Sequence, residues 1–158
     1  MTDIVSVWIA AAFDPAYLCG GWASVRRLGP EPAGHAGGER RTTALRMLLT
    51  GLAAGLRGAP PTAAVTVKTH AAEAAMLAGV LSGATPGPEG DLDLWAPVLA
   101  ACRGRAVKVI AAPSGPDTPM AFARAWAELS RDKTKAKGPF TAAIPRANLI
   151  KVDWPRTD

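Results

Sequence analysis

Residues 39–56 carry an adjacent pair of arginines and a pair of threonines near their start, continue with regularly spaced leucines, and constrain the fold more than any other stretch. Leucine recurs every three to four residues, at positions 45, 48, 49, 52 and 56. This spacing makes one side of a helix apolar, and that side must face a core. Thr42 or Thr43 can accept a hydrogen bond from the amides that the first helical turn leaves unpaired. We therefore expect an amphipathic helix that begins at these threonines.

The segments around this helix predict an α/β fold. Residues 4–12 are apolar almost throughout, as in a central strand covered on both faces, and residues 20–28 form a second strand that contains glycine. Residues 63–69 form a β-branched strand after the helix, so we expect it to run parallel to the first strand. Residues 30–38 are rich in proline and glycine, which predicts a turn region before a short third strand that ends near Arg41.

The rest of the chain alternates between helical and strand patterns. We expect helices over 71–81, 91–102 and 120–130, a loop over 82–90, and the last strand of the sheet over 105–112. The main domain is expected to span residues 1–131.

Residues 132–158 are predicted to form a basic hinge followed by an extended segment. The hinge is the RDKTKAK stretch at 131–137. It is either a solvated linker or a segment that contacts phosphate. Residues 138–154 are too apolar for a disordered tail. They either fold back on the domain or pair with another copy of the chain.

Length and charge bound the function only broadly. A chain of 158 residues fits one domain, and its net charge of +5 weakly favours phosphate-bearing partners. The first residues lack the pattern of a signal peptide, and nowhere do eighteen apolar residues run uninterrupted. We expect a cytoplasmic protein that makes no membrane contact.

Five segments, in this order, resemble those of the bacterial-type ribonuclease H family. The segments are VWIAAAF (7–13), GGWASVRRLG (20–29), GGERRTTALRML (37–48), VTVKTH (65–70) and DLW (93–95). The resemblance covers about residues 4–131 and implies a ribonuclease H-like fold, a five-stranded mixed sheet flanked by helices. In that family, carboxylates hold two magnesium ions that activate a water and cut an RNA strand.

The family's carboxylate positions hold other residues in this chain. Residue by residue, the first aspartate falls on Ala10, the glutamate on Leu48, the second aspartate on His70 and the last aspartate near Ala123. Alanine and leucine offer no ligand atom, and an imidazole is a softer ligand than magnesium prefers. Three prolines in 113–119 also replace the family's histidine-bearing loop. The resemblance therefore implies a catalytically degenerate member, a pseudo-nuclease with no metal and no other cofactor.

A displaced metal site is the lesser alternative. The acidic and imidazole groups that could lie near the strand ends are Asp14, His70, Glu73 and Asp117. An active, metal-dependent ribonuclease H-type endonuclease would then depend on His70 and Asp117. Without such a site, His70 is a satisfied or solvent-facing histidine at a strand end.

Nucleic-acid binding is predicted around the start of the first helix. The family's pocket for a DNA phosphate maps onto Arg41 and Thr43, and Arg40 and Arg46 are neighbouring cations. A guanidinium beside a hydroxyl and free helix amides forms an anion site. The alternative is that Arg41 is a surface arginine and Thr43 only a helix cap.

Two functions lead the hypotheses. The first is a non-cleaving protein that binds nucleic acid, such as an RNA–DNA hybrid or another duplex. The second is a protein-interaction or dimerisation module that uses residues 138–154 and binds no nucleic acid. The family's small polar residues that read the minor groove match Ala44 and Leu45 here, so specific readout of a hybrid is not expected.

Overall fold

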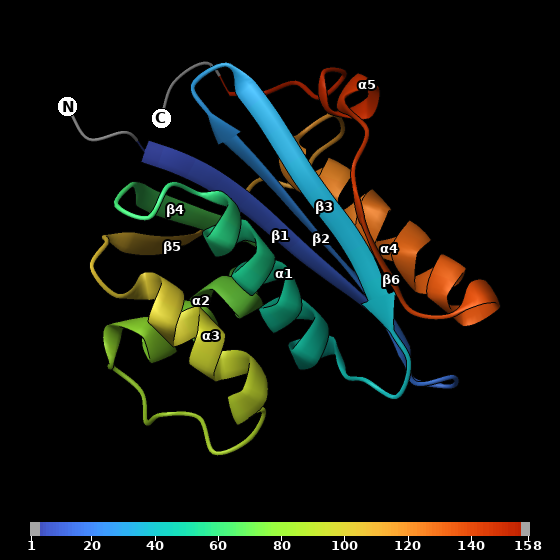
Figure 1. Cartoon of the computed structure of the whole chain (residues 1–158), viewed down its shortest axis with the longest axis horizontal. Coiled ribbons are helices and arrows are strands. Elements are labelled where there is room, and N and C mark those ends of the chain that lie inside the picture. Colours follow the sequence, from blue (N-terminus) through green and yellow to red (C-terminus); the bar gives the residue numbers. More distant parts are fainter. Residues whose placement is uncertain (1–3, 156–158) are drawn as a thin grey trace.

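The computed structural model describes residues 4–155, which form one α/β sheet structure with helices on both faces (Figure 1). The strands are β1 (Ile4–Asp14), β2 (Cys19–Leu28), β3 (Glu31–Glu39), β4 (Ala64–Thr69), β5 (Val107–Ala111) and β6 (Phe140–Ala143). The helices are α1 (Ala44–Gly58), α2 (Ala71–Ser82), α3 (Leu92–Cys102), α4 (Pro119–Lys137) and α5 (Arg146–Leu149).

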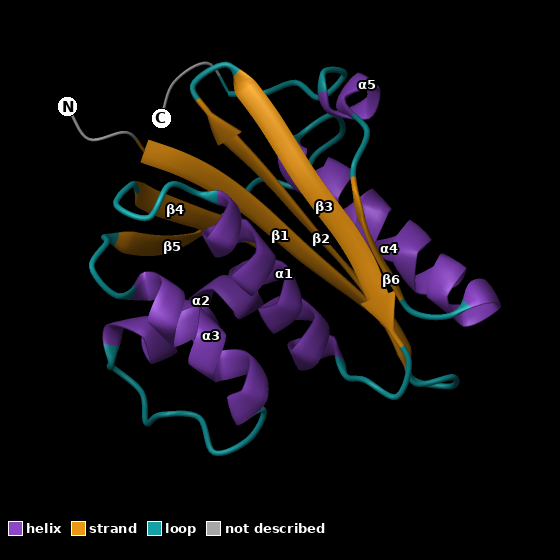
Figure 2. Ribbon diagram, in the orientation of Figure 1, coloured by secondary structure: helices purple, strands orange, loops and turns teal. Residues whose placement is uncertain are grey.

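The six strands form one mixed sheet in the order β5-β4-β1-β2-β3-β6 (Figure 2). β1 is antiparallel to β2 and parallel to β4, and β4 is parallel to β5. The predicted parallel pairing of the first strand with the strand after the helix is therefore confirmed. β1 lies inside the sheet, which explains its nearly continuous apolar sequence.

Alternate residues of β1 build two separate cores. Val5, Val7 and Ile9 face α1 and join its leucines, together with apolar residues of α2 and α3. Trp8 and Ala10 point to the other face, where they meet the small and apolar residues of α4. The period of two along the strand thus places α1, α2 and α3 on one side of the sheet and α4 on the other (Figure 1).

Two glycines allow α4 to approach the sheet closely. A Cβ added at Gly21 of β2 would overlap the carbonyl oxygen of Ala127 and the amide nitrogen of Arg131. A Cβ added at Gly38 of β3 would overlap the Thr134 hydroxyl. The glycine-rich strands therefore serve as the packing surface for this helix.

Three features differ from the sequence-based expectation. The sheet has six strands instead of five, because β6 pairs antiparallel with β3. The expected turn region at 30–38 is β3 itself. The expected hinge at 131–137 is the end of α4, where Thr134 is fully buried and the lysines point outward.

The C-terminal segment folds back on its own chain, as one of the two expectations held. Ile144 donates its backbone amide to the Gly34 carbonyl oxygen at 2.9 Å, and Ile144 and Leu149 are buried against the α4-facing core. The boundaries 1–131 and 132–158 extend at either end beyond the described residues. Within residues 4–155, no helix combines the length and the apolar character that a membrane span requires.

Candidate functional site

The four positions that match the family's carboxylates lie on both faces of the central strands. Ala10 and Ala123 are buried together on the α4 face of the sheet. Leu48 belongs to the core on the α1 face, and His70 follows β4 directly, at the residue that precedes α2. The structure therefore separates these positions, because Ala10 and Ala123 lie on one face of the sheet while Leu48 and His70 line a pocket on the other, where the residue contributed by β1 is Ala11.

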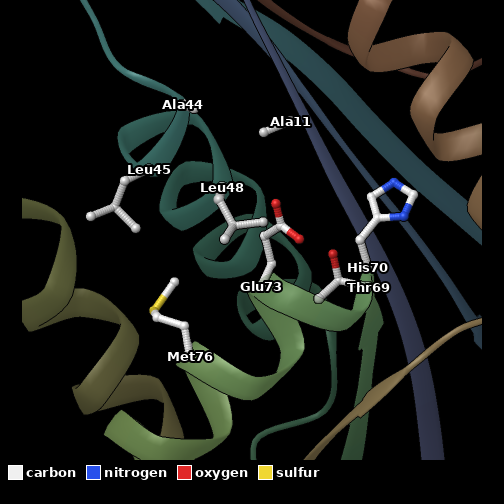
Figure 3. Close-up of a pocket in the computed structure, with 8 residues that line it drawn as sticks. All are labelled: Ala11, Ala44, Leu45, Leu48, Thr69, His70, Glu73 and Met76. Atoms are coloured by element: carbon white, nitrogen blue, oxygen red, sulfur yellow. The ribbon is translucent and has the colours of Figure 1, made fainter.

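An apolar pocket of about 230 Å³ opens on the α1 side of this place (Figure 3). We call it the apolar pocket. Its lining residues are Ala11, Ala44, Leu45, Leu48, Thr69, His70, Glu73 and Met76. Figure 3 shows the Glu73 carboxylate directed toward Leu48, with the His70 ring on the side away from Leu45. The Thr69 hydroxyl can act only as an acceptor there, because its proton is donated to the Ile9 carbonyl oxygen at 2.8 Å.

These residues do not fit a magnesium cage. Such a cage needs several oxygen ligands, mostly carboxylates, around each ion. Among residues 4–155, no three His, Cys, Asp or Glu side chains gather closely enough to hold a metal ion. Glu73 is the single carboxylate that lines the apolar pocket.

The other candidate ligands have different partners. Asp14 accepts hydrogen bonds from the amides of Ala16 and Tyr17 at 2.9 and 3.3 Å and pairs with Lys135 at 3.4 Å. Burial raises the pKa of Asp14, but these hydrogen bonds and the lysine charge outweigh it and leave the pKa lowered. Asp117 begins the approach to α4 with a φ of 66°, and its carbonyl oxygen accepts the Asp153 amide. Neither residue lines the apolar pocket.

A second, polar pocket of about 170 Å³ lies at the start of α1. We call it the arginine pocket. It is lined by Glu39, Arg40, Arg41, Thr42, Arg46, Met47, Thr50 and Leu94. Three of the four predicted nucleic-acid-binding residues are among these, and Thr43 is not.

The two threonines at this helix start have separate roles. The Thr43 hydroxyl accepts the Arg46 amide at 3.1 Å and is the N-cap of α1. Thr42 is only 6% exposed, and its hydroxyl has no hydrogen-bond partner in the described part of the chain. Arg41 adopts the left-handed φ of 53°, so the backbone turns sharply just before the helix. Sequence reasoning did not single out Thr42 as a ligand group, because its burial depends on the tertiary fold.

Arg46 connects α1 to the start of α3. Its guanidinium donates to Asp91 at 3.0 Å and to Asp93 at 2.7 Å. These hydrogen bonds raise the pKa of Arg46, and the bond from Arg46 lowers the pKa of Asp93. Arg46 lines the arginine pocket, but its charge is compensated, so Arg40 and Arg41 are the cations there that carry no such pair of carboxylates.

Lys135 extends the positive surface beyond the arginine pocket. Arg40 and Arg41 also line a neighbouring hollow with Tyr17 and Lys135. The Lys135 ammonium lies 3.8 Å from the centre of the Tyr17 ring, and the Lys135 carbonyl oxygen accepts Arg40 at 3.4 Å. The sequence already indicated Lys135 as part of the basic stretch 131–137. Its position beside Arg40 depends on the continuation of α4 and could not be read from the sequence.

The order and direction of the strands, with α4 and the short α5 on the far face, define a ribonuclease H fold. No protein-family model matches the sequence, and no curated protein is significantly similar to it. Solved structures resemble it clearly.

The N-terminal ribonuclease H domain of a Mycobacterium tuberculosis protein has a TM-score of 0.67 at 17% identity, covering 86% of this chain and 98% of that domain. LC9-RNase H1, a type 1 enzyme with the type 2 active-site motif, gives 0.67 at 15% identity over 99% of this chain and 88% of its own. LC11-RNase H1, solved in complex with an RNA/DNA hybrid, has a TM-score of 0.64 at 12% identity, covering 82% of this chain and 98% of its own. At these identities the likeness establishes the fold.

Proposed function

We propose that this chain is a non-cleaving protein of the ribonuclease H fold that binds nucleic acid through the arginine pocket. The observation that carries the proposal is the buried Thr42 hydroxyl beside Arg41 at the start of α1, which has no hydrogen-bond partner among residues 4–155. A buried hydroxyl without a partner costs free energy that a bound anion would recover. LC11-RNase H1, which shares this fold, was solved with an RNA/DNA hybrid.

The chemistry of the arginine pocket suits a phosphate. The first amides of α1 have no partner within the helix, and the helix dipole favours negative charge at this end. Arg41 adds a planar guanidinium that can donate two parallel hydrogen bonds to phosphate oxygens. Glu39 also lines the pocket, so we expect moderate affinity.

The proposal that the chain does not cleave rests on the donor set. Two-metal hydrolysis needs carboxylates at positions that hold Ala10, Leu48 and Ala123 here. The apolar pocket at Leu48 and His70 would exclude a hydrated cation, because its lining is mostly hydrocarbon.

The test is a titration of labelled RNA–DNA hybrid, double-stranded DNA and double-stranded RNA, with magnesium present, at about 50 and about 200 mM salt. We expect binding that weakens with salt and yields no cleavage product. Arg41→Gln should lower affinity roughly tenfold, since it removes a charge-assisted contact. Arg103→Gln is the matched control, because Arg103 is an exposed arginine after α3 that lines neither pocket.

The other outcomes identify the alternatives. Cleavage that is lost in His70→Ala or Asp117→Ala would show an active enzyme with displaced ligands. Absence of binding to all three duplexes, with a dimer in solution, would favour an interaction module. The apolar residues of 138–154 that pack in the chain's own core leave β6, an edge strand of four residues, as the part open to such a partner.

A further inference from the structure

The apolar pocket and the arginine pocket lie on opposite sides of the first turns of α1. Ala44, Leu45 and Leu48 line the apolar pocket. Arg46, Met47 and Thr50 line the arginine pocket. At 100° per residue these two sets point about 160° apart, so the helix itself stands between the two pockets.

A phosphate does not suit the apolar pocket. Leu48 and Met76 offer no hydrogen bond, and the Glu73 carboxylate would repel an anion. Within residues 4–155, no hydrogen bond or ion pair engages Glu73, whose side chain is directed into the pocket (Figure 3). The pocket therefore suits a neutral group that has an apolar body and an N–H donor at its edge.

The volume of the apolar pocket further limits which ligands can occupy it. Sites for complete small-molecule ligands commonly measure roughly 300–1,000 Å³. A cavity of about 230 Å³ instead fits one ring system that belongs to a larger ligand. A ligand that also places an anion in the arginine pocket must reach across a helix about 10 Å wide. A single nucleotide is too short for this, whereas a strand is long enough.

We propose that the apolar pocket takes one unpaired nucleobase from a nucleic-acid strand whose phosphate, one or more nucleotides away, lies in the arginine pocket. This inference rests on the proposed function and adds its substrate class: nucleic acid that contains an unpaired base. A paired base is stacked within its duplex and hides its hydrogen-bonding edge, so it cannot enter.

Glu73 gives the pocket a preference among bases. Its carboxylate accepts a hydrogen bond from the exocyclic amino group of adenine or cytosine. The N–H of uracil or thymine is flanked by two carbonyl oxygens, which the same carboxylate repels. Adenine should therefore bind better than uracil at the unpaired position.

The experiment compares four probes by fluorescence anisotropy at one salt concentration. They are a fully paired duplex, the same duplex with one bulged adenine, the same duplex with one bulged uracil, and adenosine monophosphate. We expect the bulged adenine to tighten binding about tenfold over the paired duplex. Adenosine monophosphate should bind far more weakly than the bulged duplex.

Three variants assign the effect to the apolar pocket. Ala44→Leu narrows the pocket at an exposed helix position and should abolish the advantage of the bulged adenine. Ala100→Leu makes the same change at an exposed position of α3 outside both pockets, and the advantage should persist. Glu73→Gln should bring adenine and uracil closer together.

The possible failures are distinct. Arg41-dependent binding with no gain from a bulged base overturns this inference and leaves the proposed function intact. Binding to none of the nucleic-acid strands overturns both and points to a protein side chain as the occupant. If adenosine monophosphate binds as tightly as the bulged duplex, the apolar pocket is a small-molecule site. That result would contradict the proposal that the bound base belongs to a nucleic-acid strand.

Discussion

One hydroxyl group fixes the start of α1. Thr43 caps the helix through the Arg46 amide, and the same arginine then reaches Asp91 and Asp93 at the start of α3. The cap therefore supports both the arginine pocket and the contact between two helices.

Thr43→Ala should lower the free energy of unfolding by about 1 kcal/mol, the usual cost of a lost N-cap. Thr43→Ser keeps the oxygen and should retain most of the stability. Urea unfolding of the three proteins measures the difference. An equal loss in Thr43→Ala and Thr43→Ser would show that the methyl group, and not the hydroxyl, matters.

His35 on β3 should make stability depend on pH. Burial lowers its pKa from the ordinary 6.5, and the positive charges of Arg26 and Arg57 lower it further. The unfolded chain therefore takes up a proton before the folded chain does, so stability falls as pH drops below 6.5 toward the lower folded pKa. Asp14 and Asp93 have lowered pKa values, so these carboxylates change the pH dependence of stability only below about pH 4.

His35→Gln should flatten this part of the pH dependence. Urea unfolding at about pH 7.5 and about pH 5.5 should show a smaller loss of stability in the variant than in the parent protein. The remaining histidine, His70, is common to both proteins, so the comparison isolates His35. An identical loss in both proteins would contradict the assignment.

At the scale of elements, the contact of α4 with β2 depends on the missing side chain of Gly21. Gly21→Ala should destabilise the protein by about 1–3 kcal/mol, because the new methyl group meets the helix backbone at Ala127 and Arg131. Gly87→Ala is the matched control, since nothing lies within 4 Å of a Cβ added there. Thermal unfolding monitored by circular dichroism measures both. Equal melting temperatures would mean that α4 shifts without cost.

The elements that the sequence predicted best are those with a strong apolar pattern, continuous in β1 and periodic in α1. β1, α1 and β4 follow their expected ranges closely because each buries a regular set of side chains. The third strand was expected, but it was placed after residue 38 because the proline and glycine content of 30–38 is typical of a turn. Its strand conformation depends on pairing with β2 and β6 on either side.

The end of α4 was missed for a related reason. Its lysines resemble a solvated linker, and only the burial of Thr134 against Gly38 shows that the helix continues. That contact joins residues far apart in sequence, so no local pattern indicates it.

At the scale of the whole molecule, the two ends of the described chain depend on each other. β6 pairs with β3, and Arg27 donates a hydrogen bond to the Pro155 carbonyl oxygen. The ring of Trp154 packs edge-on against that of Trp8, with 5.3 Å between the ring centres. Residues 140–155 are therefore part of the structure that β1 begins.

Removing residues 139 onward should lower stability and promote self-association, because the backbone groups of β3 at the sheet edge would lose their partners. Light scattering over a range of concentrations, together with urea unfolding, compares the shortened chain with the full one. A shortened chain that stays monomeric and equally stable would show that β6 contributes little.

The candidate site was only partly predictable as a set of positions. Leu48 and His70 line the same pocket, but Ala10 lies in the core on the opposite face of the sheet, and the β1 residue in that pocket is Ala11. A phosphate pocket at the start of α1 was expected from the resemblance, but the apolar pocket was not, since its volume depends on how α1 and α2 pack. Likewise, the charge of Arg46 was visible in the sequence, but its partners lie 45 and 47 residues away.

The pairing of β6 with β3 also has a consequence for biosynthesis. A ribosome releases β3 early and β6 more than a hundred residues later. During that interval the β3 edge of the nascent sheet carries unpaired amide and carbonyl groups, with which any extended polypeptide could form hydrogen bonds. Slow translation of the intervening messenger would lengthen this exposure, so the yield of native protein in cells should depend on how quickly the last strand is made.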